Sequence, residues 1–290
     1  TFKDERHLLR IIDKIVSAVG RRVDESNPYV DARLADGSRF NAMVPPIAVD
    51  GSLVSIRKFK KDKLGIDDLV NFGAFSEEMA AYLQAAVATR LNIIVSGGTG
   101  SGKTTALYAF MQQAHSPEVK IITIEDPVEY KLDDIVQTQV ADDYTFASGL
   151  RAILRQDPDV IMVGEIRDRE VAETAINAAQ TGHLVFTTLH TNSAAAAFSR
   201  LIDLGVDYRT LGNAVNLVLG QRLVRKLCDD CKVAYEAPET ERSALLQLLE
   251  DHPGRQSTTE PLTLYRPTGC AKCGQTGFRG RKGIFEAIRI

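Results

Sequence analysis

The chain has 290 residues, a formal net charge of -3 and 44% hydrophobic residues, the composition of a globular protein with about two domains. This charge gives no overall attraction to nucleic acid or anionic lipid. No apolar run approaches the ~18 residues that a membrane-spanning helix needs, and the first residues do not form a signal peptide. We therefore expect a cytoplasmic protein with no direct membrane insertion.

A small α+β domain is predicted over residues 1–62. Apolar side chains recur at helical spacing over residues 7–19. Apolar and polar residues then alternate on both sides of Asp36-Gly37, a hairpin turn signal, and a third strand is expected over 53–59.

A linker over residues 63–75, which follows the charged run 60–63, is expected to lead into a larger domain over 76–227. Strand-like apolar runs alternate in that domain with helical segments, which implies an α/β fold with a mainly parallel sheet covered by helices. The predicted strands are 91–96, 119–124, 159–164 and 184–189. The predicted helices are 105–115, 145–156, 169–181, 194–204 and 208–227.

A glycine-rich stretch between the first of these strands and the first helix fits G-x-x-x-x-G-K-[ST], the phosphate-binding P-loop. Backbone N–H groups and a helix N-terminus would surround a polyphosphate there. Lys103 would reach the β- and γ-phosphates, and the Thr104 hydroxyl would be a ligand of Mg²⁺. The alternative is a glycine-rich turn that fits by chance. The residues expected to contact ATP are Gly97, Gly98, Thr99, Gly100, Ser101, Gly102, Lys103, Thr104 and Thr105.

Acidic and histidine side chains follow the other predicted strands, and ligands of parallel sheets bind at the carboxyl ends of the strands. Glu125, Asp126 and Glu129 lie so close in sequence that a cation such as Mg-nucleotide would be needed among them, although a solvated acidic loop is the alternative. Glu165 follows a glycine where P-loop enzymes usually have Asp, so it is left to serve the attacking water or Mg²⁺. His190, at another strand end, is a candidate sensor of the γ-phosphate.

Phosphoryl transfer usually needs an arginine near the γ-phosphate. Arg39 and Arg57 in the first domain are the candidates, with ordinary surface charge as the alternative for each. We expect both to act from the N-terminal domain.

Two C-x-x-C pairs contain all the cysteines of the chain, Cys228, Cys231, Cys270 and Cys273. Such a set predicts a closed structural site for tetrahedral Zn²⁺, with reduced thiols or a redox pair as alternatives. The interval between the pairs is longer than usual and holds a predicted helix, 239–250, and a polar loop, 252–260. Residues 228–290 are therefore expected to form a zinc subdomain.

Together these motifs resemble the secretion ATPase superfamily of the GspE/PilB type, which serves type II secretion and type IV pilus assembly. Its Walker A motif, aspartate box, atypical Walker B motif, histidine box and tetracysteine region are matched in that order by Gly97–Thr105, Ile124–Tyr130, Leu154–Asp168, Thr181–Thr191, and Gln221–Cys228 with Cys270–Gly283. The N-terminal portion is more similar to the Tad-type (CpaF-like) pilus ATPases in Arg21–Ser26, Asp31–Leu34 and Ser55–Phe59.

The resemblance implies a hexamer of RecA-like P-loop domains, each beside a PAS-like N-terminal domain that contributes Arg39 and Arg57. It implies that Glu129 and Glu165 share catalysis, and that the tetracysteine region marks an assembly motor and not a retraction motor. The implied partners are an inner-membrane platform protein and other secretion or pilus components. The protein would then be peripheral to the inner membrane through these partners.

We therefore expect a hexameric ATPase that powers pilus or pseudopilus assembly or protein secretion. A RecA-type helicase or nucleic-acid translocase is the alternative, but it would need a basic track with aromatic side chains, and this chain has no Trp and a negative net charge. The intact Lys103, Glu129 and Glu165 argue against a scaffold that is only gated by nucleotide. We also expect the chain to be a fragment that lacks a leading domain for a membrane partner.

Overall fold

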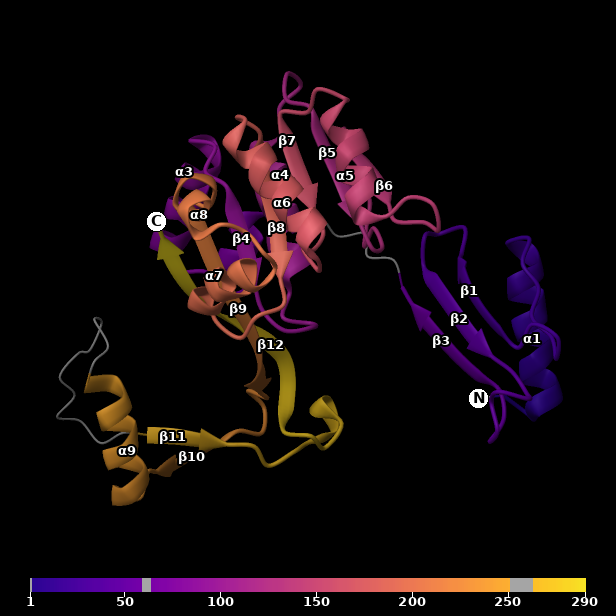
Figure 1. The fold of residues 1–290 in the computed structure, drawn as a ribbon. Coiled ribbons are helices and arrows are strands. Elements are labelled where there is room, and N and C mark those ends of the chain that lie inside the picture. Colours follow the sequence, from indigo (N-terminus) through magenta and orange to yellow (C-terminus); the bar gives the residue numbers. More distant parts are fainter. Residues whose placement is uncertain (1, 59–63, 251–262) are drawn as a thin grey trace.

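A small N-terminal domain is built from a helix and an antiparallel sheet (Figure 1). The computed structural model describes residues 2–58, 64–250 and 263–290, so the charged run 60–63 and the polar loop 252–260 lie outside the described residues. The elements of this domain are α1 (Glu5–Ala18), β1 (Tyr29–Arg33), β2 (Arg39–Met43) and β3 (Leu53–Arg57). Ile12 and Val16 of the helix pack on Phe40 and Ala42 of the sheet, because alternate strand residues face the helix. The α+β prediction for this domain is confirmed in its elements, and its PAS-like character stays a prediction.

A seven-stranded sheet in the order β12-β9-β4-β8-β7-β5-β6 forms the larger domain. All neighbouring strands are parallel except β12, which is antiparallel to β9. The strands are β4 (Ile93–Ser96), β5 (Ile121–Glu125), β6 (Val136–Gln139), β7 (Val160–Val163), β8 (Leu184–Leu189), β9 (Leu217–Leu227) and β12 (Phe278–Arg289). The four predicted strands are confirmed as β4, β5, β7 and β8, whereas β6 was not predicted.

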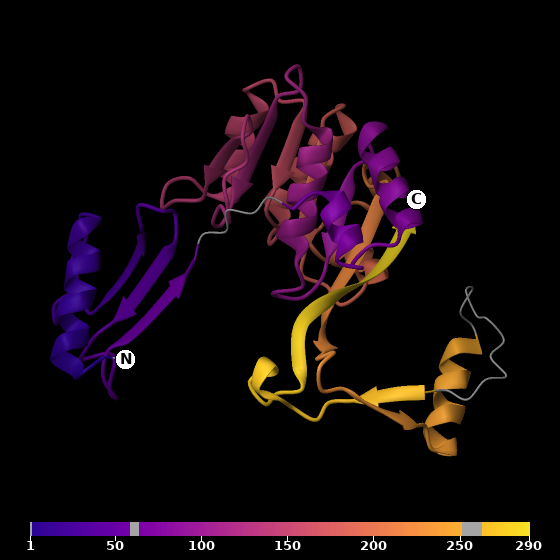
Figure 2. The ribbon, with the colours of Figure 1, turned by 180° about the vertical axis from the view of Figure 1, so that it is seen from behind.

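Helices cover both faces of this sheet, each over its own buried cluster of apolar residues (Figures 1 and 2). One face packs against α2 (Ile66–Asn71), α3 (Glu77–Ala88) and α4 (Lys103–Ala114). The other face packs against α5 (Phe146–Leu154), α6 (Arg169–Gln180), α7 (Ala194–Asp203) and α8 (Tyr208–Ala214). This is the layered α/β arrangement that the sequence predicted.

The helix predicted over residues 208–227 is wrong. Only its first part is helical, as α8, and the remainder is strand β9. Leu217 and Leu219 are fully buried beside β4, so pairing with that strand and with β12 outweighs the local helical pattern.

Two predicted boundaries also differ from the structure. The expected linker, 63–75, contains α2, whose Ile66 and Leu69 are buried in the core of the larger domain. The expected zinc subdomain, 228–290, ends in β12, which is an edge strand of the main sheet and packs Phe285 against Phe75. In both segments, apolar side chains find partners in the larger core that the local sequence does not reveal.

An arm extends from the sheet where β9 and β12 continue beyond it as a two-stranded ribbon (Figures 1 and 2). The arm carries the cysteines, the antiparallel strands β10 (Val233–Glu236) and β11 (Thr263–Arg266), and α9 (Glu239–Glu250), which lies between these strands in the chain. The predicted helix over 239–250 is confirmed. No described residue between the cysteine pairs belongs to a buried apolar cluster.

Candidate active site

The glycine-rich loop lies between β4 and α4, as the motif predicts, and two of its glycines are required by close contacts. A Cβ on Gly97 would lie 2.4 Å from the Gln221 carbonyl oxygen, and one on Gly102 would lie 2.8 Å from Gln221 Nε2. Gly102 also has φ of +92°, a left-handed conformation that favours glycine. The loop can therefore pass close to β9 and turn directly into α4.

Lys103 begins α4, and its side chain is almost fully buried. Its Nζ donates hydrogen bonds of 2.8 Å and 2.9 Å to the carbonyl oxygens of Gly97 and Gly98. Burial lowers the pKa of Lys103, and the nearby charge of Glu165 opposes that change. The ammonium group is thus held inside the loop that would surround a phosphate.

Polar groups around this loop fit a polyphosphate. The Ser101 hydroxyl, which can donate to a phosphate oxygen, is buried and has no hydrogen-bond partner within the described residues. The N-terminal N–H groups of α4 also point to the loop, and Thr104 and Thr105 in its first turn are partly exposed. The loop and its surroundings can hold the triphosphate of ATP, with Thr104 as a ligand of Mg²⁺.

Glu165 is the centre of a charged cluster just beyond β7. Its carboxylate is paired with Arg167 through one oxygen, and its other oxygen lies 3.3 Å from Nε2 of His190. Arg167 also reaches Asp126, with 3.4 Å between the nitrogen and the carboxylate oxygen. Burial is the main cause that lowers the pKa of His190, and the charge of Lys103 acts in the same direction. The structure thus brings together Glu165, His190, Lys103 and Asp126 of the predicted site.

The glycine that precedes Glu165 has a structural cause. A Cβ on Gly164 would lie 3.1 Å from the Ile124 carbonyl oxygen and 3.3 Å from Glu125 Cα. The backbones of β7 and β5 approach closely there, so a side chain at this position would require the neighbouring strand to shift by a few tenths of an ångström. Glu165, one residue later, is the acid at this strand end.

Glu125 does not occupy the position predicted for a nucleotide ligand. It is 2% exposed, and both of its carboxylate oxygens are engaged inside the protein, one by Tyr108 and the other by Thr123 and Gln137. Burial raises the pKa of Glu125. The assignment of Glu125 to ATP or Mg²⁺ is corrected, because its carboxylate is enclosed. The carboxylates of Asp126 and Glu129 are the exposed acids of this loop.

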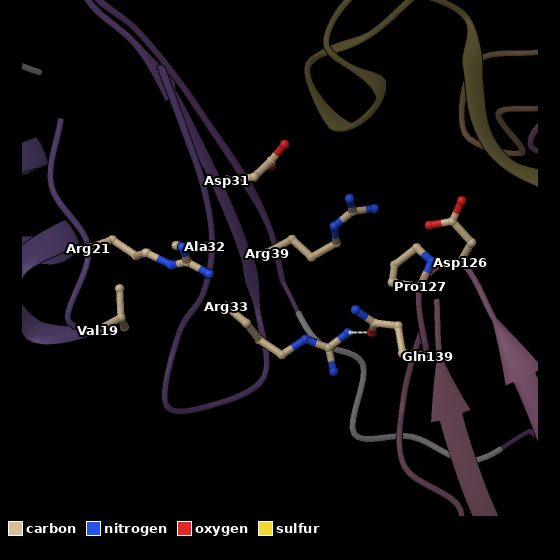
Figure 3. Close-up of a pocket in the computed structure, with 9 residues that line it drawn as sticks. All are labelled: Val19, Arg21, Asp31, Ala32, Arg33, Arg39, Asp126, Pro127 and Gln139. Atoms are coloured by element: carbon tan, nitrogen blue, oxygen red, sulfur yellow. Dashed lines mark hydrogen bonds between the residues drawn. The ribbon is translucent and has the colours of Figure 1, made fainter. Parts of the chain in front are cut away.

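Arginines of the N-terminal sheet meet the aspartate box across a cavity of about 410 Å³ (Figure 3). Arg39 extends into this cavity toward Asp126 and Pro127. Arg33 donates hydrogen bonds of 3.1 Å to the Val128 carbonyl oxygen and 2.7 Å to Gln139 Oε1. Arg33 was not among the predicted site residues, although it pairs with Arg39 in the neighbouring strand.

Arg57 pairs in register with Arg39 but is exposed and does not line this cavity. No P-loop residue lines it either. The structure therefore brings Arg39 to the aspartate box and brings neither predicted arginine to the P-loop.

The four cysteines form a compact cluster at the base of the arm, with all their sulfur atoms within 4.8 Å of one another. Sulfur–sulfur distances are 3.9 Å for Cys228 to Cys270, 3.8 Å for Cys231 to Cys273, and 3.7 Å for Cys270 to Cys273. A tetrahedron with Zn–S bonds of ~2.3 Å has edges of about 3.8 Å, so these distances fit Zn²⁺ and are too long for disulfides. It is the one group of metal-binding side chains found among the described residues.

A P-loop that closes around a buried lysine, beside a carboxylate from the neighbouring parallel strands, defines this domain as a P-loop nucleotide-binding domain. The chain matches the family described as type II/IV secretion system protein over residues 1–290 and belongs to that family. Among the described residues, no helix has the length and apolar content needed to cross a bilayer.

Known relatives of this chain are secretion and pilus ATPases. The type II secretion system ATPase E of Vibrio cholerae serotype O1 is 52% identical over 200 residues, which cover 68% of this chain and 38% of the relative. The type IV pilus assembly ATPase PilB of Pseudomonas aeruginosa is 46% identical over 229 residues, which cover 78% of this chain and 38% of the relative. The chain thus spans well under half the length of these relatives.

Solved structures of related motors share the fold. The pilus retraction motor PilT with bound ADP superposes with a TM-score of 0.61 and 32% identity, over 78% of this chain and 67% of that one. The ATPase DotB of Legionella pneumophila gives a TM-score of 0.58 and 28% identity, over 84% of this chain and 72% of that one.

Proposed function

We propose that the chain is the motor portion of a cytoplasmic ATPase that hydrolyses ATP to power pilus or pseudopilus assembly, or protein secretion, across the bacterial envelope. The observation that carries this proposal is the cluster in which buried Lys103 lies beside Glu165, with Arg167 and His190 on the same carboxylate. A protein that only binds nucleotide has no need of a poised carboxylate beside the phosphate site. Membership of the secretion family supports the same reaction.

When bound, Mg-ATP would supply the phosphoanhydride bond, with the metal neutralising part of the phosphate charge. Lys103 and the backbone of the loop would bind the phosphates, and Thr104 would be a ligand of Mg²⁺. Glu165 and Glu129 orient the attacking water and accept its proton. His190 contacts Glu165 and senses the γ-phosphate through it. Arg167 ties Glu165 to the aspartate box at Asp126.

We also propose that the motor is a homohexamer in which the N-terminal domain supplies Arg39 and Arg57 to the phosphates. The cavity between Arg39 and Asp126 would close when that domain moves toward the aspartate box. Movement of this kind would couple hydrolysis to work on an inner-membrane platform protein and other secretion or pilus components. The protein would be peripheral to the inner membrane through these partners.

The cysteine cluster is proposed to hold a structural Zn²⁺. The relevant observation is the regular spacing of its sulfur atoms at the base of an arm whose described residues between the cysteine pairs join no buried apolar cluster. In the resembling family, this region is typical of assembly motors, so assembly or secretion is proposed here and not retraction.

The test is phosphate release by the purified chain with Mg-ATP over a range of protein concentrations. Lys103→Ala and Glu165→Gln are each expected to lower turnover by about 100-fold or more, whereas Glu118→Gln, on an exposed loop, is the matched control. Turnover per subunit that rises with concentration supports a site completed in an assembly. Substantial turnover in either variant contradicts the mechanism, and stimulation by DNA would favour the translocase alternative.

A further inference from the structure

A buried hydrogen-bond network lies directly behind the aspartate box. Glu125, the last residue of β5, is 2% exposed, and Tyr108 of α4 is 0% exposed. The Tyr108 hydroxyl bonds to Oε2 of Glu125, while Thr123 Oγ1 and Gln137 Nε2 donate to Oε1 at 2.6 Å and 3.2 Å. A carboxyl group is costly to bury, so its retention in this core needs a reason beyond packing.

The Tyr108 hydroxyl is the branch point of this network. A hydroxyl can donate one hydrogen bond, and that of Tyr108 donates it to Glu125. The oxygen is then left to accept, and it accepts from the backbone N–H of Glu129 at 3.2 Å and from Gln137 Nε2 at 3.3 Å. Glu125 thus fixes the direction in which the hydroxyl can accept, which is toward Glu129.

Tyr108 also connects two parts of the proposed active site. It lies on α4, the helix that begins with Lys103 of the P-loop. Its hydroxyl accepts a hydrogen bond from the backbone N–H of Glu129, whose own side chain is exposed. The distance between the phosphate-binding lysine and the aspartate-box glutamate is therefore set through one rigid helix and one hydrogen bond.

We propose that Tyr108 is a positioning residue that holds Glu129 in register with Lys103, and that Glu125 is the acceptor that orients the Tyr108 hydroxyl. This inference rests on the proposed function, because it assumes that Glu129 takes part in hydrolysis. Packing alone does not require the hydroxyl, since a phenylalanine ring would fill the same space. The exposed loop at Glu129 would then bond to water, and its position would no longer be fixed.

The experiment compares Tyr108→Phe with Tyr82→Phe in the full chain. Tyr82 packs against the same core, and its buried hydroxyl has no partner among the described residues, so its loss removes none of the hydrogen bonds that these residues make. We measure kcat for Mg-ATP, the Kd of a fluorescent ATP analogue and the unfolding midpoint of each variant. Activity is measured well below each midpoint, so that every variant is folded.

Tyr108→Phe is expected to lower kcat by about tenfold while the nucleotide Kd stays within about twofold, because only the placement of Glu129 changes. Tyr82→Phe is expected to leave both within about twofold. The double variant Tyr108→Phe/Glu125→Gln separates placement from stability. A neutral amide at position 125 relieves the buried carboxylate that has lost its donor, so the unfolding midpoint recovers, whereas kcat stays low.

Three results would overturn the inference: an unchanged kcat in Tyr108→Phe, an equal loss of nucleotide affinity, or a kcat that recovers in the double variant. An unchanged kcat would mean that Tyr108 does not position Glu129. An equal loss of affinity would indicate a distorted P-loop helix, and a recovered kcat would indicate an effect of stability alone. Wild-type turnover and its loss in Glu129→Gln test the proposed function separately. If those fail, the proposed function is wrong whatever Tyr108→Phe does.

Discussion

Replacement of Cys270 by serine should unfold the arm and leave the sheet of the larger domain folded. Cys270 lies 3.9 Å from Cys228 and 3.7 Å from Cys273, so it is one corner of the sulfur tetrahedron. Structural zinc contributes on the order of 10–16 kcal/mol in zinc-finger peptides. No buried apolar cluster includes the described residues between the cysteine pairs, so we expect the metal to be the main stabilising interaction for that part of the arm.

The size of the expected effect follows from this comparison. Even a fraction of the metal's contribution exceeds the ~0.5–1.5 kcal/mol of a typical hydrogen bond between β10 and β11. Cys270→Ser should therefore lower bound zinc from about one ion per chain to nearly none. Hydrogen exchange in Val233–Glu236 and Thr263–Arg266 should approach the rate of an unfolded peptide, whereas β4 and β7 keep their protection.

Bound zinc is measured by plasma mass spectrometry, and exchange is measured by mass spectrometry of peptides. Lys272→Gln, in the same turn as Cys270, is the control. It breaks the ion pair with Asp230 and leaves every thiol in place. Retained zinc and retained protection of β10 and β11 in Cys270→Ser would refute the zinc assignment. An equal loss of protection in β4 would refute the separation of arm and sheet.

Three further predictions concern the active site. Arg33→Ala removes the hydrogen bonds from the N-terminal sheet to the aspartate box, so turnover should fall several-fold in a phosphate-release assay while the unfolding midpoint is unchanged. Gly102→Ala should weaken ATP binding by about tenfold or more in a nucleotide titration, since a left-handed residue costs ~1–2 kcal/mol and its Cβ would meet Gln221. Because burial lowers the pKa of His190, the unfolded chain binds this proton more readily, and the free energy of unfolding should fall as pH drops below about 6.5. The free energy of unfolding, measured by denaturant titration near pH 7.5 and near pH 5.5, should differ less between these two values in His190→Gln than in wild type.

The parallel strands of the sheet were predictable because strands buried on both faces read as continuous apolar runs. Ile93–Ser96 and Val160–Val163 are buried at every position, so their patterns need no tertiary information. Their carboxyl ends were also predictable meeting points, and Lys103, Glu165 and His190 do converge there. The pattern of the strands therefore located the site before any contact was known.

Strand pairs that depend on distant partners were not predictable. Val136–Gln139 is a short edge strand whose side chains are exposed or half-buried, so it carries no apolar pattern. Leu217–Leu227 continues a helical-looking segment and becomes a strand only because β4 and β12 flank it. Likewise, the sequence could not distinguish Glu125 from Glu129, because the tyrosine that encloses Glu125 comes from another element.

The structure joins the phosphate loop and the cysteine cluster through a single strand. The first half of β9 is buried beside β4, and its Gln221 carbonyl faces Gly97 so closely that no side chain fits between them. The second half pairs with β12 and leads directly to Cys228. Residues Leu217–Gly220 have a paired strand on each side, whereas the continuation of β9 toward Cys228 pairs with β12 alone. A displacement of the arm would therefore reach Gln221, which contacts the P-loop, through this two-stranded ribbon. The cysteine cluster is therefore connected to the phosphate loop through the ribbon of β9 and β12.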